Sequence, residues 1–596
     1  MKQSLLSMLL ITSIKLTCLG QNEFQTFVFE GNNFRWNQTT NGSLFYNETE
    51  SFMGLEVPIN ESNFSIFAST LWVGGLNEND ELKISYRRFC SNEDENCFEN
   101  WGPLKLDGSM HSAAEVEMFN HVWFVTAESI DEHMGYFDCL NNPNCNIEQE
   151  YPDYSIPSDF LTWPAEGQNG FAENLAPFID YNNDGFYTPE EGDHPAICGD
   201  FSSYAIWNDM GIAGASSDGN EIGLEVHTTV YGYDSGIESD FNTLFVKHKL
   251  INRGSHTLQV TYTGFWTDFD IGNPNDDYVQ TDVARSMFFG YNGIGFDGGS
   301  SSGPGYGSDV PAMGVKILSG PLKDSNNEDD EAELENSYGN EAAGYGDGII
   351  DNERLGLYAS LAYNNASGPI ATRDPQTGLD YYNYMQSIWK DGAPLTFGGS
   401  GYPPEPPVIT SKYMFVAETD PLLAGTNGID PEYPFEGGWT EENEGFPAED
   451  RRMVGSSGPF TFTPGDIQYI DLAYIFARQS YDENETEIET LQRFADEVEG
   501  RQCEPLPPIV LSTNSPNPQK LDFEVFPNPA QQYFTVDLKE TFGKLNLFDL
   551  TGKLILQDRI GSVIQRVDTS NLTEGIYLIQ ISAENKIYHS KIIITK

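Results

Sequence analysis

Short apolar runs, many of them with an apolar residue at every second position, dominate the chain between residues 65 and 477. This pattern predicts β-strands, and the alternation is typical of antiparallel sheets with one face in water. The runs that we expect to form strands are 65–73, 122–127, 223–231, 243–252, 257–266, 285–291, 312–318, 412–417 and 468–477.

Two segments have a helical pattern instead. Residues 379–389 form the first, and residues 483–499 form the clearer one. In the second, one face gathers the apolar side chains, and Gly500 follows as a stop signal. That apolar face consists of Ile488, Leu491, Phe494, Ala495 and Val498.

The last 75 or so residues contain further strand-like runs separated by turn residues. Together they predict a small antiparallel β-sandwich, and Pro527 and Pro529 suit an edge strand because proline cannot donate to a ladder. Residues 504–521, rich in Pro, Ser and Asn, are typical of a linker. The expected strands of this tail are 534–538, 545–550, 553–556, 576–581 and 587–594.

The sequence therefore predicts a mainly β protein with several parts. We expect a signal peptide (1–20), an N-terminal β-rich region (21–175), a main β-rich domain (176–503), the linker and an immunoglobulin-like tail (522–596). Lys2, the apolar stretch 5–14 and the small residues before Gln21 favour signal cleavage there. Cys18 could suggest a lipoprotein, but Lys15 occupies a position where an aliphatic residue is needed. No stretch of the sequence has the roughly 20 apolar residues of a membrane span.

Charge separates the tail from the rest. The chain contains 31 Lys+Arg and 91 Asp+Glu, a net charge of −60, whereas residues 522–596 contain 8 basic and 9 acidic residues. The acidic excess therefore lies upstream, where it disfavours nucleic acid and anionic membranes as partners. It suits saline or calcium-rich surroundings, either as a means of solubility or as a means of binding cations.

Six cysteines follow the expected signal peptide, an even number that predicts disulfides in an exported protein. Proximity favours Cys90–Cys97 and Cys139–Cys145, which leaves Cys198 to pair with Cys503. A zinc site is the alternative, but the sequence has no CxxC pair.

The clearest chemical motif runs from Asp180 to Glu191. In the register of an EF-hand loop, Gly185 is at the sharp turn of position 6. Calcium prefers about seven oxygen ligands around such a turn, so we predict a structural Ca²⁺ site. An acidic surface turn that binds nothing is the alternative. The expected ligands are Asp180, Asn182, Asp184, the Phe186 carbonyl and Glu191.

A second acidic cluster follows the expected strand 257–266. Asp268 and Asp270 are two residues apart and share one face if the strand continues. The cluster could be a second metal site, a carboxylate pair for glycoside hydrolysis or a solvated loop. Its possible ligands are Asp268, Asp270, Asp276, Asp277 and Asp282.

The tail resembles a known family through four blocks: residues 526–529 (FPNP), 547–553 (LFDLTGK), 572–577 (LTEGIY) and 591–596 (KIIITK). They are similar to the type A C-terminal sorting domain of type IX secretion cargo in Bacteroidetes. The resemblance implies that residues 522–596 bind the secretion machinery and that the upstream passenger works outside the cell or on its surface. Segments 68–75, 180–195 and 382–392 resemble blocks of large uncharacterised exported proteins of the same group.

Three classes of function stay open for the passenger. The first is a calcium-stabilised binding or adhesion protein, with a polysaccharide or another surface as ligand. The second is a carboxylate-based hydrolase, and the third is a structural coat component. The sequence contains no HExxH, GxSxG or P-loop motif, which favours the first class over an enzyme.

Overall fold

The computed structural model divides the chain into two compact units, Met1–Val510 and Leu511–Lys596. The expected signal peptide, the linker and the Cys90–Cys97 pair lie outside the described residues. The structure describes residues 24–47, 54–88, 100–108, 113–168, 170–210, 221–300, 303–334, 338–365, 368–403, 408–479, 485–501, 503, 524–526, 530–537, 543–548, 554–560, 564–569, 572, 575–583 and 586–595.

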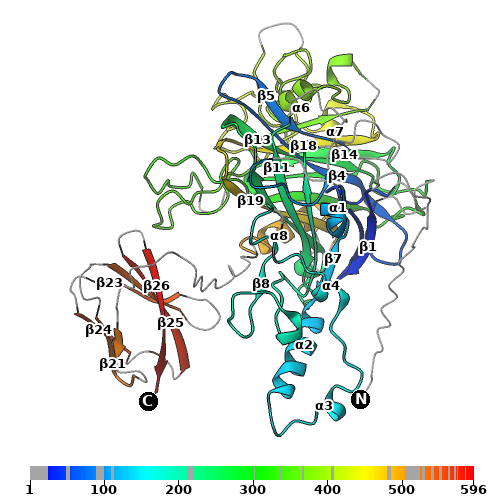
Figure 1. The fold of residues 1–596 in the computed structure, drawn as a ribbon. Coiled ribbons are helices and arrows are strands. Elements are labelled where there is room, and N and C mark those ends of the chain that lie inside the picture. Colours follow the sequence, from blue (N-terminus) through cyan, green and yellow to red (C-terminus); the bar gives the residue numbers. More distant parts are fainter. Residues whose placement is uncertain are drawn as a thin grey trace. The chain divides into compact units, whose positions relative to one another are not determined.

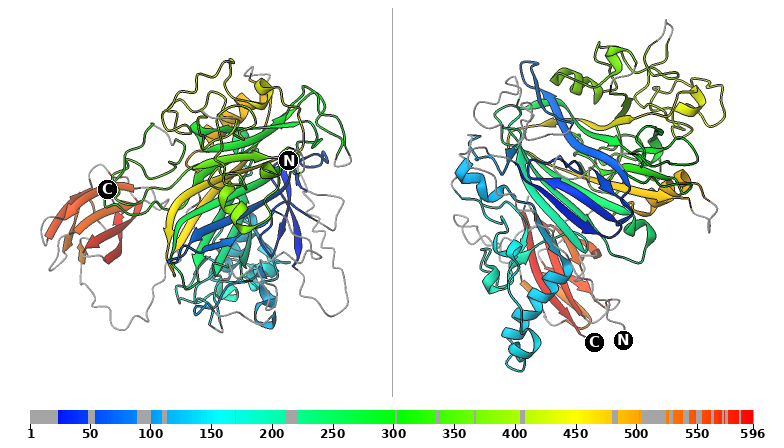
Figure 2. Two further views of the ribbon diagram at one scale, coloured as in Figure 1. Left: turned by 90° about the horizontal axis from the view of Figure 1, so that it is seen from above. Right: turned by 90° about the vertical axis from the view of Figure 1, so that its right-hand side faces the viewer.

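Two large antiparallel sheets build the first unit (Figures 1 and 2). The first sheet has the order β1-β2-β3-β4-β13-β18-β17, and β5 pairs with β4. Its strands are β1 Thr26–Gly31, β2 Phe34–Thr39, β3 Leu55–Glu56, β4 Phe64–Leu76, β5 Leu82–Ser85, β13 Leu258–Phe269, β17 Ala359–Tyr363 and β18 Arg451–Phe462.

The second sheet has the order β14-β15-β16-β19-β12-β11-β10-β6, and β7 pairs with β10. Its strands are β6 Asn100–Trp101, β7 Trp123–Thr126, β10 Phe201–Asn208, β11 Leu224–Gly232, β12 Thr243–Asn252, β14 Asp277–Asp282, β15 Met287–Asn292, β16 Pro311–Ser319 and β19 Ile467–Arg478. Short helices in the connections are α5 Glu238–Phe241, η3 Val283–Arg285, η4 Ile370–Thr372, α6 Gly378–Tyr384 and α7 Glu441–Glu444.

The sequence of the central strand β19 is almost continuously apolar, and the positions of its side chains in the core explain why. Leu472 and Tyr474 belong to the core cluster that also contains side chains of the first sheet. Ala473 and Ile475, which point the other way, belong to a second cluster. Because successive side chains alternate between the faces of a strand, both faces of β19 are buried.

Helix α8 (Glu487–Glu497) covers that second face. Thr486 caps its N-terminus in a capping box with Glu489, and Leu491 and Phe494 are buried in the second cluster. The helix expected at 483–499 is thus present, but it spans only Glu487–Glu497 and begins directly after its capping residue Thr486.

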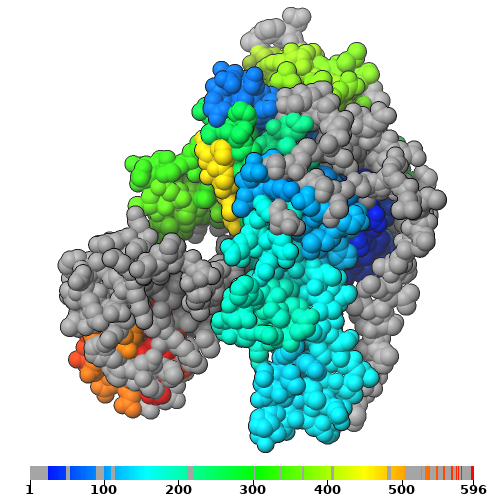
Figure 3. Space-filling model, in the orientation of Figure 1, coloured from blue at the N-terminus to red at the C-terminus, as the bar shows by residue number. Residues whose placement is uncertain are grey.

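A helical lobe (residues 127–200) lies between β7 and β10 in the sequence (Figures 1 and 3). Its longest helix, α2 (Ala127–Leu140), extends away from the sheets and was not predicted from the sequence. The other elements of this segment are α1 Ala113–Val116 and η1 Glu117–Phe119, which precede the lobe, and α3 Ile147–Glu150, α4 Ser158–Leu161, β8 Phe178–Ile179, η2 Pro189–Glu191 and β9 His194–Pro195.

Three expectations need correction. The division expected at residue 175 does not separate the sheets, because β4 pairs with β13 and β7 with β10. The strand expected at 412–417 does not form, because Phe415 and Ala417 have φ values of 52° and 48°, which a ladder cannot accommodate. The helix expected at 379–389 ends at Tyr384, and Ser387 beyond it has a φ of 54°.

Two of the three expected disulfides are confirmed. Cys139 joins Cys145 at the end of α2, with a Cα–Cα distance of 5.2 Å. Cys198 joins Cys503 across 305 positions of sequence, with a Cα–Cα distance of 5.7 Å. The second bond links the chain just after α8 to the segment that precedes β10.

The second unit is a small sandwich of two antiparallel sheets, in the orders β20-β21-β24 and β23-β22-β25-β26. Buried side chains such as Phe534, Leu547 and Ile579 form a core of its own. The predicted fold of the tail is therefore confirmed. No described helix in either unit is long and apolar enough to cross a membrane. The strands are β20 Glu524–Phe526, β21 Tyr533–Asp537, β22 Gly543–Phe548, β23 Leu554–Ile560, β24 Ile564–Asp568, β25 Gly575–Ala583 and β26 Lys586–Ile594.

Residues 21–505 are expected to fold without the tail, because the core clusters of the two units share no described residue. Calorimetry of the full chain and of the 21–505 fragment should show the same midpoint for the passenger transition. A fragment that lacks this transition, or that melts well below the full chain, would contradict the prediction. The full chain serves as the control under the same oxidising conditions.

Candidate functional site

The Asp180 loop is closed by a short ladder. Strands β8 and β9 pair Phe178 with Pro195 and Ile179 with His194, so the two ends of the loop lie side by side. Gly185 has a φ of +89°, a conformation that favours glycine, and no atom lies within 4 Å of where a Cβ would be. The glycine is therefore needed for the turn and not for close packing.

Backbone amides organise the acidic side chains of this loop. Asp180 accepts from the amides of Asp184 (3.2 Å) and Gly185 (2.8 Å). Asn182 Oδ1 accepts from Asp184 N at 2.9 Å, and Asp184 Oδ1 accepts from Phe186 N at 2.9 Å. Such side-chain-to-backbone bonds hold the carboxyl and amide groups on the inside of the turn.

The Asn182 amide joins the two ends of the expected ligand set. Its Nδ2 donates to Asp184 Oδ2 at 3.1 Å and to Glu191 Oε2 at 2.5 Å. The structure therefore links Asn182 to Asp184 and Glu191, and Asp180 to the amides of the turn. The carboxylates of Asp180, Asp184 and Glu191 are not among the described groups whose oxygens all lie within 4.8 Å of one another. The Phe186 side chain is 62% exposed, which leaves only its backbone for the loop. Hard oxygen donors of this kind suit Ca²⁺.

Asp193 fixes the backbone of the loop through hydrogen bonds. The spacing of the motif did not reveal this role. Asp193 is fully buried and accepts from the amides of Tyr181 (2.8 Å) and Thr188 (2.7 Å). Burial raises the pKa of Asp193, the two amides oppose that shift, and the charges of Asp180 and Asp184 add to it. A cation in the loop would reduce this repulsion.

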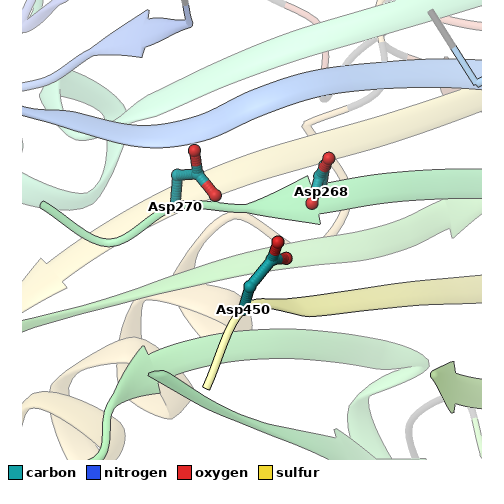
Figure 4. A group of neighbouring side chains, drawn as sticks. All are labelled: Asp268, Asp270 and Asp450. Atoms are coloured by element: carbon teal, nitrogen blue, oxygen red, sulfur yellow. The ribbon is translucent and has the colours of Figure 1, made fainter. Parts of the chain in front are cut away.

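The second acidic site lies where β13 ends and β18 begins. The strands are antiparallel, with Asp268 opposite Arg452, so Asp450 comes close to Asp268 and Asp270. One carboxylate oxygen from each aspartate lies within 4.8 Å of those of the other two. Figure 4 shows Asp450 reaching from the neighbouring strand toward the other two. We call Asp268, Asp270 and Asp450 the aspartate triad.

Two arginines border the aspartate triad. Arg452 Nε donates to Asp268 Oδ2 at 3.0 Å, and its Nη1 donates to Asp374 at 3.0 Å. Arg88 also pairs with Asp374. Burial raises the pKa of Asp268 to about 7, although Arg452 opposes the shift. Burial raises the pKa of Asp270 well above its ordinary value too, and the neighbouring aspartates add to the effect.

The other three candidates of the second cluster lie elsewhere. Asp277 is fully buried and accepts from the Ile271 amide at 2.9 Å. Asp282 caps η3 and pairs with Arg285 at 3.0 Å. Asp276 is not part of the triad either. The structure thus keeps Asp268 and Asp270 from the expected set and adds Asp450, which the sequence separates from them by far.

A surface depression of about 620 Å³ is found beside α8. Its lining includes Arg285, Thr419, Pro421, Ile488 and Gln492, and none of the aspartate triad. The depression therefore gives no access to the paired carboxylates.

Comparison with known proteins identifies the tail. Residues 524–595 match the family described as the secretion system C-terminal sorting domain. The chain is thus a type IX secretion cargo, and this route leads out of the cell or to its outer surface. The match covers the tail alone and is silent about the passenger.

Other similarities are small in extent. An endo-acting ulvan lyase of Formosa agariphila is 37% identical over 76 residues, which are 12% of this chain and 15% of the lyase. A polysaccharide lyase structure aligns at 7% identity with a TM-score of 0.17, over 62% of this chain and 34% of its own. PorZ, a surface component of the type IX secretion system of Porphyromonas gingivalis, aligns at 11% identity with a TM-score of 0.12, over 72% and 46%. TM-scores of this size carry no argument about the fold.

Proposed function

We propose that the exported passenger is a calcium-stabilised extracellular binding protein, with the Asp180 loop as its calcium site. The observation that supports this proposal is the arrangement of Asp180, Asn182, Asp184 and Glu191 around the Gly185 turn. Three carboxylates, one amide and the Phe186 carbonyl would supply the oxygens that Ca²⁺ prefers.

The surroundings of the loop favour a structural role for the ion. Tyr187 N donates to Glu166 at 3.1 Å, and Tyr181 Oη donates to Asp138 on α2 at 2.7 Å. The loop is thereby attached to the body of the helical lobe, which the Cys139–Cys145 bond also restrains. A cation that ties the ends of the loop together would stabilise the lobe.

Binding is favoured over hydrolysis by the burial of the paired aspartates. Glycoside hydrolysis needs two carboxyl groups that face the substrate from opposite sides of the scissile bond. Asp268 is only 2% exposed and is held by Arg452. The ligand class that we propose is a polysaccharide or another surface, because the passenger is exported and its acidity disfavours nucleic acid. Binding and product release on a panel of polysaccharides, with and without chelator, distinguish a binding protein from a hydrolase.

Removing calcium is expected to lower the melting temperature of the passenger. Loops of this kind in extracellular modules have dissociation constants of about 10⁻⁴–10⁻³ M, and calcium at one hundred times that constant stabilises by about 2.7 kcal/mol. Asp184→Ala and Glu191→Ala should each remove most of the difference between calcium-loaded and chelator-treated protein in differential scanning fluorimetry.

The matched control for these variants is Asp153→Ala. Asp153 is an exposed aspartate of the same lobe and lies outside the loop. Its variant should keep the full response to calcium. If the wild type melts at the same temperature with and without chelator, the loop is an acidic turn and the calcium part of the proposal fails.

A further inference from the structure

The aspartate triad contains carboxylate oxygens that the protein itself does not satisfy. Asp268 is 2% exposed, and its Oδ1 has no hydrogen-bond partner among the described residues. Oδ1 of Asp450 is likewise buried and unpartnered within the described part of the chain. A buried polar atom without a partner is costly, and native proteins rarely leave one unless an ion or water completes it.

The charges around the triad do not balance. Arg452 and Arg88 contribute two positive charges, and Asp268, Asp270, Asp450 and Asp374 contribute four negative charges when ionised. Both arginines engage Asp374, and Arg452 also bonds to Asp268 and lies 3.8 Å from Asp450 Oδ2. The remaining charge of −2 equals the charge that a divalent cation would neutralise.

We propose that the aspartate triad binds a calcium ion that joins the end of β13 to the start of β18, at a second site independent of the Asp180 loop. Asp268 at the end of β13 and Asp270 just beyond it would face the ion from one side, and Asp450, just before β18, would face it from the other (Figure 4). Hard carboxylate oxygens favour Ca²⁺ over softer metals, since the site contains no sulfur or imidazole ligand among the described residues.

The three carboxylates would supply only part of a calcium shell. Three carboxylates supply three to six oxygens, depending on whether each binds with one atom or two, and Ca²⁺ takes six to eight. The Asp450 side chain is 30% exposed, although its Oδ1 is buried. Asn365 Nδ2 donates to Asp450 Oδ2 at 3.0 Å and orients that carboxylate, which leaves Oδ1 for the ion.

Calorimetric titration of the full chain with CaCl₂ tests the proposal. A variant with Asp184→Ala and Glu191→Ala removes the loop site and should still bind about one equivalent of calcium. Adding Asp450→Asn or Asp270→Asn to it should abolish that equivalent or weaken it at least tenfold. Adding Glu449→Gln, which removes the same charge at the neighbouring position, should leave it unchanged.

The stoichiometries distinguish a failure of the loop site from a failure of the triad site. If the wild type and the loop variant both bind one equivalent, and Asp450→Asn removes it, the loop proposal fails and the triad stands. If the loop variant binds no calcium, or if Asp270→Asn and Asp450→Asn both keep the wild-type stoichiometry, the triad proposal is overturned. Anomalous scattering from crystals of the wild-type chain soaked in TbCl₃ provides a check without variants, with a peak expected between the three carboxylates and its absence counting against them.

Discussion

Replacing Cys198 and Cys503 with serine is expected to lower the free energy of unfolding by as much as about 5 kcal/mol. The two cysteines are 305 positions apart, so their bond closes most of the passenger into one loop. Without the bond the unfolded chain gains conformational entropy, and this gain grows slowly with loop length. Urea unfolding of the double variant and of the wild type measures the loss.

The native structure around the bond should survive its removal. The Cys503 backbone is held by Lys247 Nζ, which donates to its carbonyl at 2.6 Å, and by a bond from its amide to Tyr231 Oη at 3.3 Å. Helix α8, just upstream, keeps Leu491 and Phe494 buried against the second sheet. The loss of unfolding free energy in the double variant therefore comes mainly from the greater entropy of the unfolded state.

The second disulfide provides a matched control. Cys139 and Cys145 are 6 positions apart, so the chain-entropy relation gives only about 2 kcal/mol for their replacement. The two double variants should thus differ clearly in the midpoint of unfolding. Equal losses would contradict the loop-length argument and would point to local strain or packing at Cys198–Cys503.

The apolar pattern located several strands of the passenger but missed others, such as β10 and β18, which also lie between two strands. The expected segment 243–252 coincides with β12, and 468–477 differs from β19 by one residue at each end. The apolar pattern wrongly predicted a strand at 412–417, since a pattern of side chains contains no information about a positive φ at Phe415. It also missed α2, whose buried face is small: the buried residues there are His133, Phe137 and Cys139.

The two candidate sites also differ in how far the sequence alone can predict their ligands. All ligands of the Asp180 loop lie within one segment, so residue types at fixed spacing could reveal it. Asp450 reaches Asp268 only through the register of β13 against β18, and a single sequence does not state which strands pair. Conversely, Asp277 and Asp282 are close to Asp270 in sequence, but Asp277 binds a backbone amide and Asp282 pairs with Arg285.

His248 is expected to make the passenger sensitive to acid. It lies on β12, is 3% exposed, and burial lowers the pKa of its imidazole to about 3. Trp207 Nε1 donates to Thr228 Oγ1 at 3.0 Å, so the Thr228 hydroxyl is free to donate to His248 Nδ1, also at 3.0 Å. This chain of bonds needs a neutral imidazole, with Nδ1 as the acceptor.

The direction in which stability changes with pH follows from the pKa values of His248 in the unfolded and in the folded state. An unfolded histidine has a pKa of about 6.5, so between pH 6.5 and pH 3 the unfolded state binds a proton that the folded state excludes. The contribution of His248 to stability is therefore complete above pH 6.5 and is lost as the pH falls toward 3. The full window corresponds to roughly 4 to 5 kcal/mol, of which about 2.5 kcal/mol is lost by pH 4.5.

Carboxyl groups with raised pKa values, such as Asp268, act in the opposite direction, so the test compares two proteins in which they are unchanged. The variant His248→Gln should be less stable than the wild type at pH 7 by about 1 to 3 kcal/mol, because the glutamine amide does not place an acceptor at the position where Nδ1 accepts from Thr228. At pH 4.5 this difference should have shrunk or changed sign, since glutamine does not titrate. Parallel stability curves for the wild type and His248→Gln between pH 7 and pH 4.5 would show that the buried imidazole does not control the acid response.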